Sequence, residues 1–296
     1  TLNVAGDLDQ RGTLQGESVQ LTSTGTLTNQ GNILAGGGES RLSAKDIVQL
    51  EAGSVQAGGN LTLISDNTLN NKGLIGTTGD LLVQAGGVLH NSSVLYTGGN
   101  MRLLSDSLTN VFGTILAGNN LWVQRDTQGN ASTSLLNSSG TIETQSGDIT
   151  INTGTLTNQR EGLVVTETES TAGSVPEWVG KTRVDIPIAL FRPEEYGLVI
   201  TYRHTSASTV KFARYAPYET AEIKKISLGS KAIEISSRGS EGIIKSGKNI
   251  FIESKLITND ASNILSLENT TLSGDRLVSK AYQSGYLHEY LTYVYA

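Results

Sequence analysis

The residues that could do chemistry in this chain are few, and the acidic ones among them recur at a fixed spacing. Four aspartates share a frame of twenty residues, with Gly86 in the empty slot: Asp46, Asp66, Asp106 and Asp126. Stacked carboxylates can form a calcium ladder or the paired acids of a polysaccharide-cleaving site. They can also cap turns, because an Asp side chain accepts hydrogen bonds from nearby backbone N–H groups. No Lys or Arg column accompanies them, and the calcium-binding nonapeptide repeat is absent, so we favour turn capping.

Other catalytic or metal-binding groups are scarce. The chain has no Cys, which excludes disulfides and cysteine metal sites, and it has only three His. None of these, His90, His204 or His288, accompanies a serine-nucleophile signature. His90 lies inside a strand-like segment, which favours a packing or corner role. We therefore predict that the protein is not an enzyme and has no catalytic residue, metal or cofactor.

The composition favours a β-rich chain. The 296 residues include 34 Gly and only 4 Pro, and the formal net charge is −6. Abundant Thr, Ser and Asn are typical of short strands joined by tight turns. The acidic balance argues against nucleic acid as a partner, and no apolar run approaches the ~18 residues of a membrane-spanning helix. The chain opens within its own repeat pattern, so we interpret it as a monomeric piece of a longer protein.

Two repeated motifs indicate the elements that position these residues. Leu-x-Asn recurs with its Leu at positions 27, 69, 89, 108, 135 and 156, and Ile257 begins a late echo. A Gly-Asn or Gly-Asp corner precedes an apolar residue at four positions twenty residues apart: Leu61, Leu81, Met101 and Leu121. Arg41 continues this frame backwards. The next residue of this kind, Ile149, comes 28 residues after Leu121 instead of 20, which indicates about eight extra residues near DTQGNAST.

The period predicts the fold. Alternating apolar and polar residues between glycine-rich corners indicate strands, and a unit of twenty residues cannot also hold a helix. We therefore predict an all-β chain whose residues 1–160 form a right-handed parallel β-helix with about 20 residues per coil. Coils stacked ~4.8 Å apart place Leu and Ile columns inside and Asn columns where they can hydrogen-bond along the stack. The heptapeptide TGTLTNQ, found at 24–30 and again at 153–159, is then one corner and strand of a coil.

The repeat pattern breaks after Gln159. Residues 1–160 contain only three aromatic residues, Tyr96, Phe112 and Trp122, whereas all 4 Pro lie within 176–217. Proline cannot donate to an interior ladder, so we predict a non-repeat insertion of strands and loops over 161–222. Coil-like text resumes in ISLGSKAIEIS, and we expect irregular β-helix coils over 223–296. The tyrosine-rich end is expected to pack in the core or to cap the last coil.

The segment from 161 to 296 also concentrates side chains suited to binding. Aromatic and Arg side chains dominate binding hot spots, and mixtures of basic and aromatic residues suit anionic sugars, phosphates or acidic loops. The alternative is that these aromatic residues pack the inserted strands onto the β-helix. We predict the partner-binding residues Tyr202, Arg203, His204, Lys211, Phe212, Arg214, Tyr215 and Tyr218, with Tyr286 and Tyr290 as a secondary set.

The repeats resemble a known family. The coils LTNQGNILAGG and AGGNLTL resemble the filamentous haemagglutinin repeats of two-partner-secretion exoproteins. The change at LTNQREGLVVTETES resembles the point in the CdiA family of contact-dependent growth inhibition where the first repeat region gives way to the receptor-binding region. The resemblance implies a secreted filament on the bacterial cell surface. Residues 161–296 would recognise an outer-membrane component of a neighbouring bacterium, a β-barrel protein or lipopolysaccharide, so that the full-length protein delivers a toxin.

Three alternatives stay open at this point. A host-cell adhesin can share the same repeats. A β-helix enzyme acting on polysaccharide would need a carboxylate cluster beside a Lys or Arg in a groove, and the sequence offers no convincing set. A purely structural filament segment is the third alternative, although the break in the repeats at 160–222 argues against it.

Overall fold

The computed structural model describes residues 1–296 except 172–176, 179–183, 186–195, 205–208, 218–223 and 294–296. The regular elements of the described residues are all β-strands, and no helix among them could cross a membrane. The chain divides into two compact units. The first unit, called the solenoid below, comprises Thr1–Leu163 and Ser236–Tyr282, and the second unit comprises Val164–Ile235 and Gln283–Ala296.

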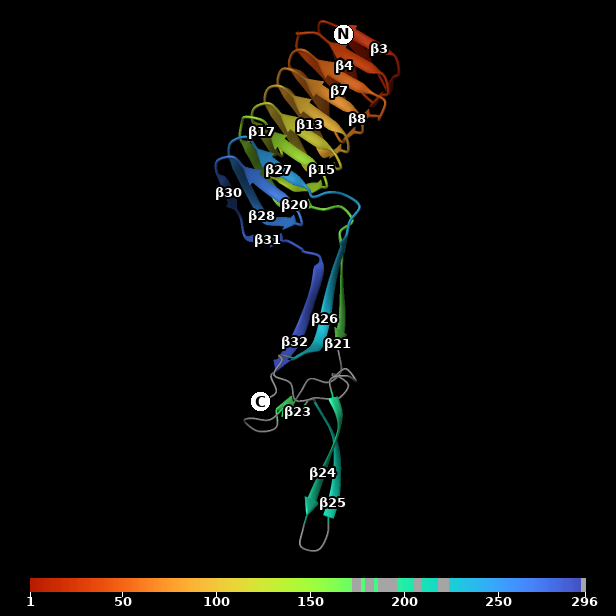
Figure 1. Ribbon diagram of the computed structural model, residues 1–296. Helices are drawn as coiled ribbons and strands as arrows, with labels where there is room; N and C mark the ends of the chain where they lie inside the picture. Colours follow the sequence, from red (N-terminus) through yellow and green to blue (C-terminus); the bar gives the residue numbers. More distant parts are fainter. Residues whose placement is uncertain (172–176, 179–183, 186–195, 205–208, 218–223, 294–296) are drawn as a thin grey trace. The chain divides into compact units, whose positions relative to one another are not determined.

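The solenoid winds through three strand positions in each coil, and strands of one position stack as a face (Figure 1). The first face holds β1 (Leu2–Val4), β4 (Gln20–Ser23), β7 (Ser40–Ala44), β10 (Leu61–Ser65), β17 (Leu121–Gln124) and β30 (Thr270–Ser273). The second face holds β2 (Leu8–Gln10), β5 (Thr26–Asn29), β8 (Asp46–Gln49), β11 (Leu69–Asn71), β18 (Ser132–Ser138) and β31 (Arg276–Lys280). Four longer strands run through both of these faces: β13 (Leu81–Asn91), β15 (Met101–Val111), β20 (Ile149–Gln159) and β28 (Ile250–Asp260).

The third face is a separate nine-stranded sheet. Its strands are β3 (Thr13–Gly16), β6 (Asn32–Ala35), β9 (Ser54–Ala57), β12 (Leu74–Thr77), β14 (Val94–Thr97), β16 (Thr114–Ala117), β19 (Thr141–Thr144), β27 (Ile243–Ser246) and β29 (Asn263–Ser266). Neighbouring strands are parallel on every face, for example β12 with β14 and β13 with β15. The predicted parallel β-helix is therefore confirmed.

Apolar side chains fill the interior of the solenoid as columns of equivalent residues. Four predicted interior residues are direct register partners in consecutive coils, each no more than 1% exposed: Leu61, Leu81, Met101 and Leu121. The frame of twenty fails one coil earlier, because Leu61 pairs with Ser40. Arg41, which we predicted to continue the frame, pairs instead with Thr62 and is exposed. The coil that begins at Ser40 is longer by one residue, which shifts the register.

A row of buried amides connects successive coils at the corner after the second face. The Nδ2 of each asparagine donates to the Oδ1 of the next at 2.7–2.8 Å, in the order Asn71, Asn91, Asn110, Asn137, Asn158 and Asn259. The same amides donate to backbone carbonyls across the corner, as from Asn137 to Gly140 at 2.9 Å. These are the asparagines of the Leu-x-Asn motif, so the predicted asparagine column is confirmed. Each buried polar group finds a partner here, as a buried network requires.

The asparagine row continues across the break in the repeats. β20 ends at Gln159, and the next strand of the same coil, β27, starts at Ile243 and pairs in parallel with β19. Gly242 holds the corner position of Gly140 in the preceding coil, since a Cβ at either residue would collide with the asparagine amides. Residues 160–241 therefore leave and re-enter the solenoid at one corner of one coil. The glycine that directly follows the first TGTLTNQ, at position 31, follows the second one only at position 242.

The return to the solenoid comes later than the sequence predicts. We expected coils from residue 223, but β26 (Lys224–Ser236) pairs antiparallel with β32 (Gly285–Tyr293). Together with β21 (Val164–Thr171) they form the three-stranded sheet β21-β26-β32 of the second unit. The tyrosine-rich end thus contains an antiparallel strand rather than a further coil. Alternation along ISLGSKAIEIS identifies a strand, but it does not identify the strand's partner.

Candidate functional site

The corner at which residues 160–241 leave the solenoid is held by charged and hydroxyl side chains. Arg160 and Glu241 form an ion pair at 3.3 Å, and Arg238 forms a second one with Glu161. The Oγ of Ser138, in the preceding coil, donates to Oε2 of Glu161 at 2.6 Å. Both ends of the inserted segment are thereby tied to each other and to the coil beside them. This corner, formed by Arg160, Glu161, Arg238 and Glu241, is called the root of the insertion below.

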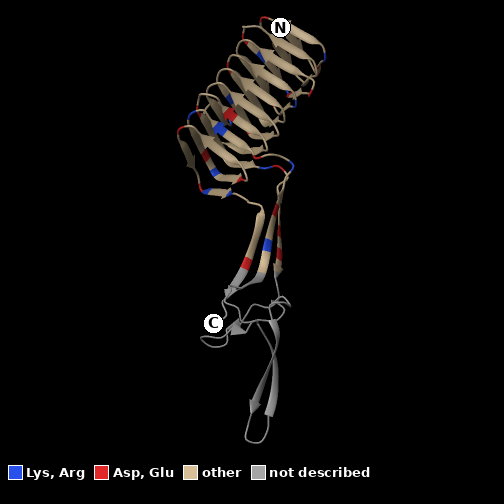
Figure 2. Ribbon diagram, in the orientation of Figure 1, with Lys and Arg blue, Asp and Glu red and all other residues tan. Residues whose placement is uncertain are grey.

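Within the second unit, the three-stranded sheet carries a charged cluster. Lys231 of β26 forms ion pairs with Glu167 and, at 3.5 Å, with Glu169, both in β21 (Figure 2). The hydrogen bond that Lys231 donates to Glu167, and the negative charge of Glu167, raise the pKa of Lys231. These groups are solvent-accessible, so the cluster contributes little to stability.

Most of the predicted binding residues lie on one antiparallel ribbon. β24 (Tyr196–His204) and β25 (Thr209–Pro217) pair from Tyr196↔Pro217 to His204↔Thr209. A shorter antiparallel pair, β22 (Glu177–Trp178) with β23 (Val184–Asp185), precedes it in the chain. Seven predicted residues belong to the ribbon: Tyr202, Arg203, His204, Lys211, Phe212, Arg214 and Tyr215. Tyr218 lies outside the described residues.

The register divides these seven residues between the two faces of the ribbon. Tyr202 pairs with Lys211, whereas Arg203 pairs with Val210. Because successive strand residues alternate between faces, Tyr202, His204, Lys211 and Tyr215 share one face and Arg203, Phe212 and Arg214 share the other. A flat partner can engage one of these sets at a time. Variants on the two faces therefore have different expected effects.

The secondary set of tyrosines lies on β32. Tyr286 is 75% exposed, and its ring stacks with that of His288 at a centroid distance of 6.4 Å. Tyr290 is on the same strand and pairs with Ser227 of β26. Tyr286 is therefore not the core residue that the tyrosine spacing allowed. The ring of Tyr286 is exposed to solvent.

The predicted acid column does not converge on one point. No group of three His, Asp or Glu residues close enough to hold a metal ion occurs in the described part of the chain. Asp46 accepts a hydrogen bond from the backbone N–H of Thr68 at 3.1 Å. Asp126 accepts from the backbone N–H groups of Gln128 and Asn130 at 3.0 and 3.2 Å. The Asp126 contacts are those of a capped turn, whereas the Asp46 contact reaches the next coil.

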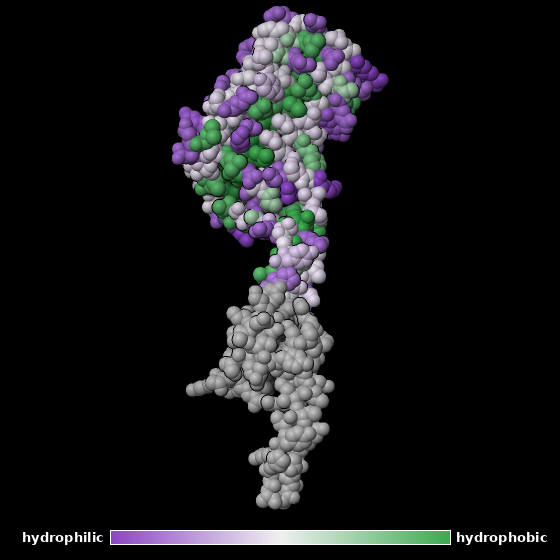
Figure 3. Space-filling model, viewed as in Figure 1, coloured by the Kyte–Doolittle hydropathy of each residue, from purple (hydrophilic) through white to green (hydrophobic). Residues whose placement is uncertain are grey.

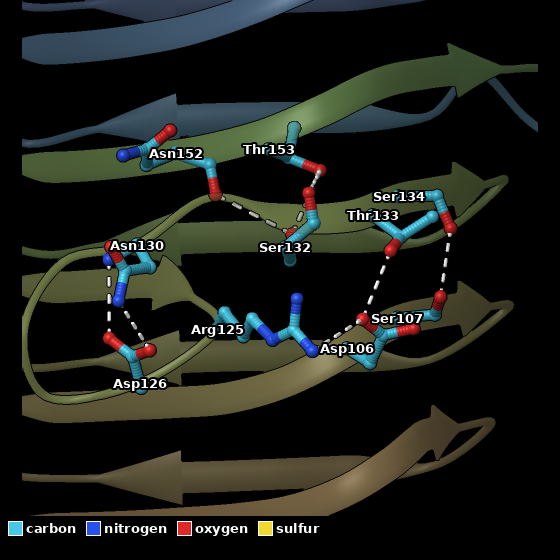
Figure 4. A network of polar contacts seen from close by, with 10 residues as sticks. All are labelled: Asp106, Ser107, Arg125, Asp126, Asn130, Ser132, Thr133, Ser134, Asn152 and Thr153. Carbon is cyan, nitrogen blue, oxygen red and sulfur yellow. Dashed lines mark hydrogen bonds and ion pairs between the residues drawn. The ribbon is translucent and has the colours of Figure 1, made fainter.

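The extra residues predicted near DTQGNAST lie in the loop 125–131 between β17 and β18, which is stabilised by a polar network (Figure 4). The side chain of Asn130 donates to Asp126 at 2.7 Å and lowers the pKa of that carboxyl group. Asn152 donates to the carbonyl of Gly129 at 2.7 Å, which holds the loop beside the first face. At the loop's base, Asp106 accepts from Thr133 at 3.0 Å. The loop is thus a fixed rim on the solenoid.

His90 contacts a side chain of the neighbouring coil. Its Nδ1 lies 2.6 Å from the Oγ1 of Thr109 in the next coil. Partial burial and, to a lesser extent, the charge of Lys72 lower the pKa of His90. The lowered pKa favours the neutral imidazole, and its contact with the Thr109 hydroxyl is consistent with a packing role.

Sequence comparison adds the family. The model of the haemagglutinin repeat matches residues 1–31, 35–121, 77–169 and 229–281, which include the coils on both sides of the insertion. The chain belongs to the haemagglutinin-repeat family. It is 53% identical, over its whole length, to the protein named deoxyribonuclease CdiA of Dickeya dadantii. It is 42% identical over 99% of its length to the tRNA nuclease CdiA of Yersinia mollaretii, and 36% identical over its whole length to that of Escherichia coli O6:K15:H31.

These family members are much longer proteins. The chain spans 9% of the Dickeya protein and 10% of the other two. The nuclease names therefore describe whole relatives, of which about a tenth aligns here. No solved structure matches the chain.

Proposed function

We propose that this chain is the receptor-binding segment of a CdiA-type filament, secreted and exposed on the surface of a bacterium. Residues 160–241 and the end of the chain recognise an outer-membrane component of a neighbouring cell, a β-barrel protein or lipopolysaccharide. The full-length protein then delivers its toxin, in contact-dependent growth inhibition. The segment itself binds and does not catalyse.

One observation carries this proposal. The repeats are interrupted at a single corner, and the interruption contains seven of the sixteen aromatic residues and a ribbon with Arg and Tyr side chains. Periodic Thr, Ser and Asn faces present similar chemistry at each coil, whereas recognition requires a surface that differs from the rest. Tyr and Arg supply large contact areas and charge-assisted hydrogen bonds, the usual anchors of binding interfaces. A rigid solenoid presents them with little ordering cost on binding.

Deletion of the insertion tests the proposal. Removing residues 160–241 joins Gln159 to Gly242 and recreates the two-residue corner Gln30-Gly31 of an earlier coil. With the chain also ended at Tyr282, the variant retains every coil of the solenoid. We expect it to fold but to lose binding to target bacteria, measured by flow cytometry with fluorescently labelled protein. If the deleted variant binds as well as the full chain, the repeats recognise the receptor and the proposal is wrong.

Point variants locate the contact within the same experiment. Arg203→Ala and Arg214→Ala, on one face of the ribbon, are each expected to weaken binding by about 1 kcal/mol or more. Tyr202→Ala and Lys211→Ala probe the other face, and Lys45→Ala, at an exposed position of the solenoid, is the control. Labelled binding to host epithelial cells instead of bacteria would favour the host-cell adhesin.

A further inference from the structure

A hollow on the first face of the solenoid has the composition of a sugar-binding site. It has a volume of about 420 Å³, within the usual range of small-molecule sites. Trp122 of β17, Thr150 of β20 and Phe251 of β28 are register partners on three consecutive coils and line it. Phe251 is 43% exposed, although a large apolar side chain gains by burial. Apolar residues lie among polar ones on the solenoid surface (Figure 3).

The two aromatic residues are separated by a small one. Trp122 and Phe251 stand two coils apart, about 9.6 Å along the stack, with Thr150 between them. The guanidinium of Arg102, in the preceding coil, lies over the ring of Trp122, 4.2 Å from its centroid. Arg102 therefore covers one face of this ring. Trp122 also lines the hollow. This arrangement leaves a slot bounded by two aromatic side chains and floored by a threonine.

A row of hydrogen-bonding side chains runs beside the aromatic row. Asn152 pairs in register with Glu253, and Gln124 lies in the coil before them, two residues after Trp122. The two rows are about 7 Å apart, because alternate strand residues point to the same face. Gly129 closes one side, where Asn152 holds the rim loop by its 2.7 Å hydrogen bond. An apolar surface therefore lies next to amide and carboxylate groups.

We propose that this hollow binds a neutral pyranose unit of a glycan. The C–H face of a pyranose is apolar and fits against an aromatic ring, while its hydroxyl groups point outward in the ring plane. The exposed carboxylate of Glu253 and the side-chain oxygen of Asn152 can accept from those hydroxyls, whereas the NH2 groups of Asn152 and Gln124 already donate to the carbonyls of Gly129 and Asp126. The lining contains no Lys or Arg and includes Glu253, which disfavours phosphate and acidic sugars. Hydrolysis uses two carboxylates, and the lining contributes one.

This site is separate from the proposed receptor-binding ribbon and does not depend on it. All of its residues belong to the solenoid, and the deletion of 160–241 retains them. A filament with a sugar site on its stem could hold a neighbouring cell's surface glycan while the insertion finds its receptor. Loss of one activity without the other is therefore expected in the appropriate variant.

Tryptophan fluorescence of the full chain tests the proposal. The chain has two tryptophans, so the Trp178→Phe variant leaves Trp122 as the only reporter. Cellohexaose, maltohexaose and chitohexaose are titrated separately to about 20 mM, well above the dissociation constant of a weak single-sugar site. We expect a saturable change in emission with at least one of them. A sulfated heparin hexasaccharide is the charged control and should give none.

Substitution of Phe251 then identifies the site. Phe251→Ala in the same background should weaken binding about tenfold, because it removes one stacking wall while the reporter stays in place. Leu265→Ala, at another exposed apolar position on the third face, should leave binding and the melting curve unchanged. The proposal is overturned if none of the three neutral sugars gives a saturable change. It is equally overturned if Phe251→Ala, folded as judged by circular dichroism, binds like its parent.

Discussion

Leu81→Asp is expected to lower the free energy of unfolding by roughly 4 kcal/mol or more, enough to unfold or aggregate much of the solenoid. Leu81 is 1% exposed and packs between Leu61 and Met101, its register partners in the neighbouring coils. A carboxylate there would have no cation or N–H donor to replace water. Since each coil contacts only its neighbours, the damage to one coil also removes the template for the next.

The adjacent position supplies the matched control. Leu82 lies on the same strand but on the outer surface, where it pairs with Thr62 and Arg102. Leu82→Asp should change the free energy of unfolding by about 1 kcal/mol at most, because its charge stays hydrated beside Arg102. Urea unfolding followed by circular dichroism measures both variants. Equal unfolding midpoints for Leu81→Asp and Leu82→Asp would contradict the assignment of Leu81 to the interior.

Asn137→Leu should cost about 3 kcal/mol, the second-largest effect that we expect. Asn137 is fully buried, accepts from Asn110 at 2.8 Å, and donates to Asn158 at 2.8 Å and to the carbonyl of Gly140 at 2.9 Å. Leucine has a similar size but can neither donate nor accept a hydrogen bond. Asn110, Asn158 and the carbonyl of Gly140 would therefore lose partners that water cannot replace. The loss falls at the coil that adjoins the root of the insertion.

A row of exposed amides on another corner provides the comparison. Asn100 donates to Asp80 at 3.2 Å and accepts from Asn120 at 3.3 Å, at a corner that water can reach. Asn100→Leu should therefore cost less than about 1 kcal/mol. Thermal melts of the two variants measure the difference. A melting temperature for Asn137→Leu as high as that of Asn100→Leu would show that the buried row contributes no more than the exposed one.

The features that recur in every coil could be predicted from the sequence. A repeated Leu or Asn reports the same environment many times, so the period, the interior column and the asparagine row follow from spacing alone. The loop at 125–131 could be predicted as well, because it lengthens a known period. Arg41 shows the limit: one additional residue in a corner changes which residue points inward, and composition does not reveal it.

Features that depend on a distant partner could not be predicted. β26 alternates like a coil strand, and only its antiparallel pairing with β32 shows that it belongs to the second unit. The sequence does contain a signal for the residue at which the chain re-enters the solenoid. Gly242-Ile243 repeats the glycine and the first strand residue that follow Leu-x-Asn in other coils, and here they continue the corner that begins at Asn158-Gln159. The hollow was also missed. Its signal is the aromatic residue that follows the first apolar residue of a coil in both GNNLWV and GKNIFI.

Whether the chain leaves and re-enters the solenoid at one corner can be measured by a cysteine cross-link. The chain has no native cysteine. Glu143 of β19 and Lys245 of β27 are register partners on opposite sides of the insertion, and their charged atoms lie 2.8 Å apart. Adjacent strands are ~4.8 Å apart, within the ~7 Å limit for a disulfide, so the pair Glu143→Cys and Lys245→Cys should cross-link under mild oxidation.

The control pair is Glu143→Cys with Leu265→Cys, because Leu265 pairs with Lys245 and thus lies one coil further away, at about 9.6 Å. Mass spectrometry of tryptic peptides identifies the bond in each oxidised protein. We predict a disulfide in nearly all molecules of the first pair and in few of the second. Absence of the bond from the first pair, or equal yields from both pairs, would contradict the continuity of the solenoid across residues 160–241.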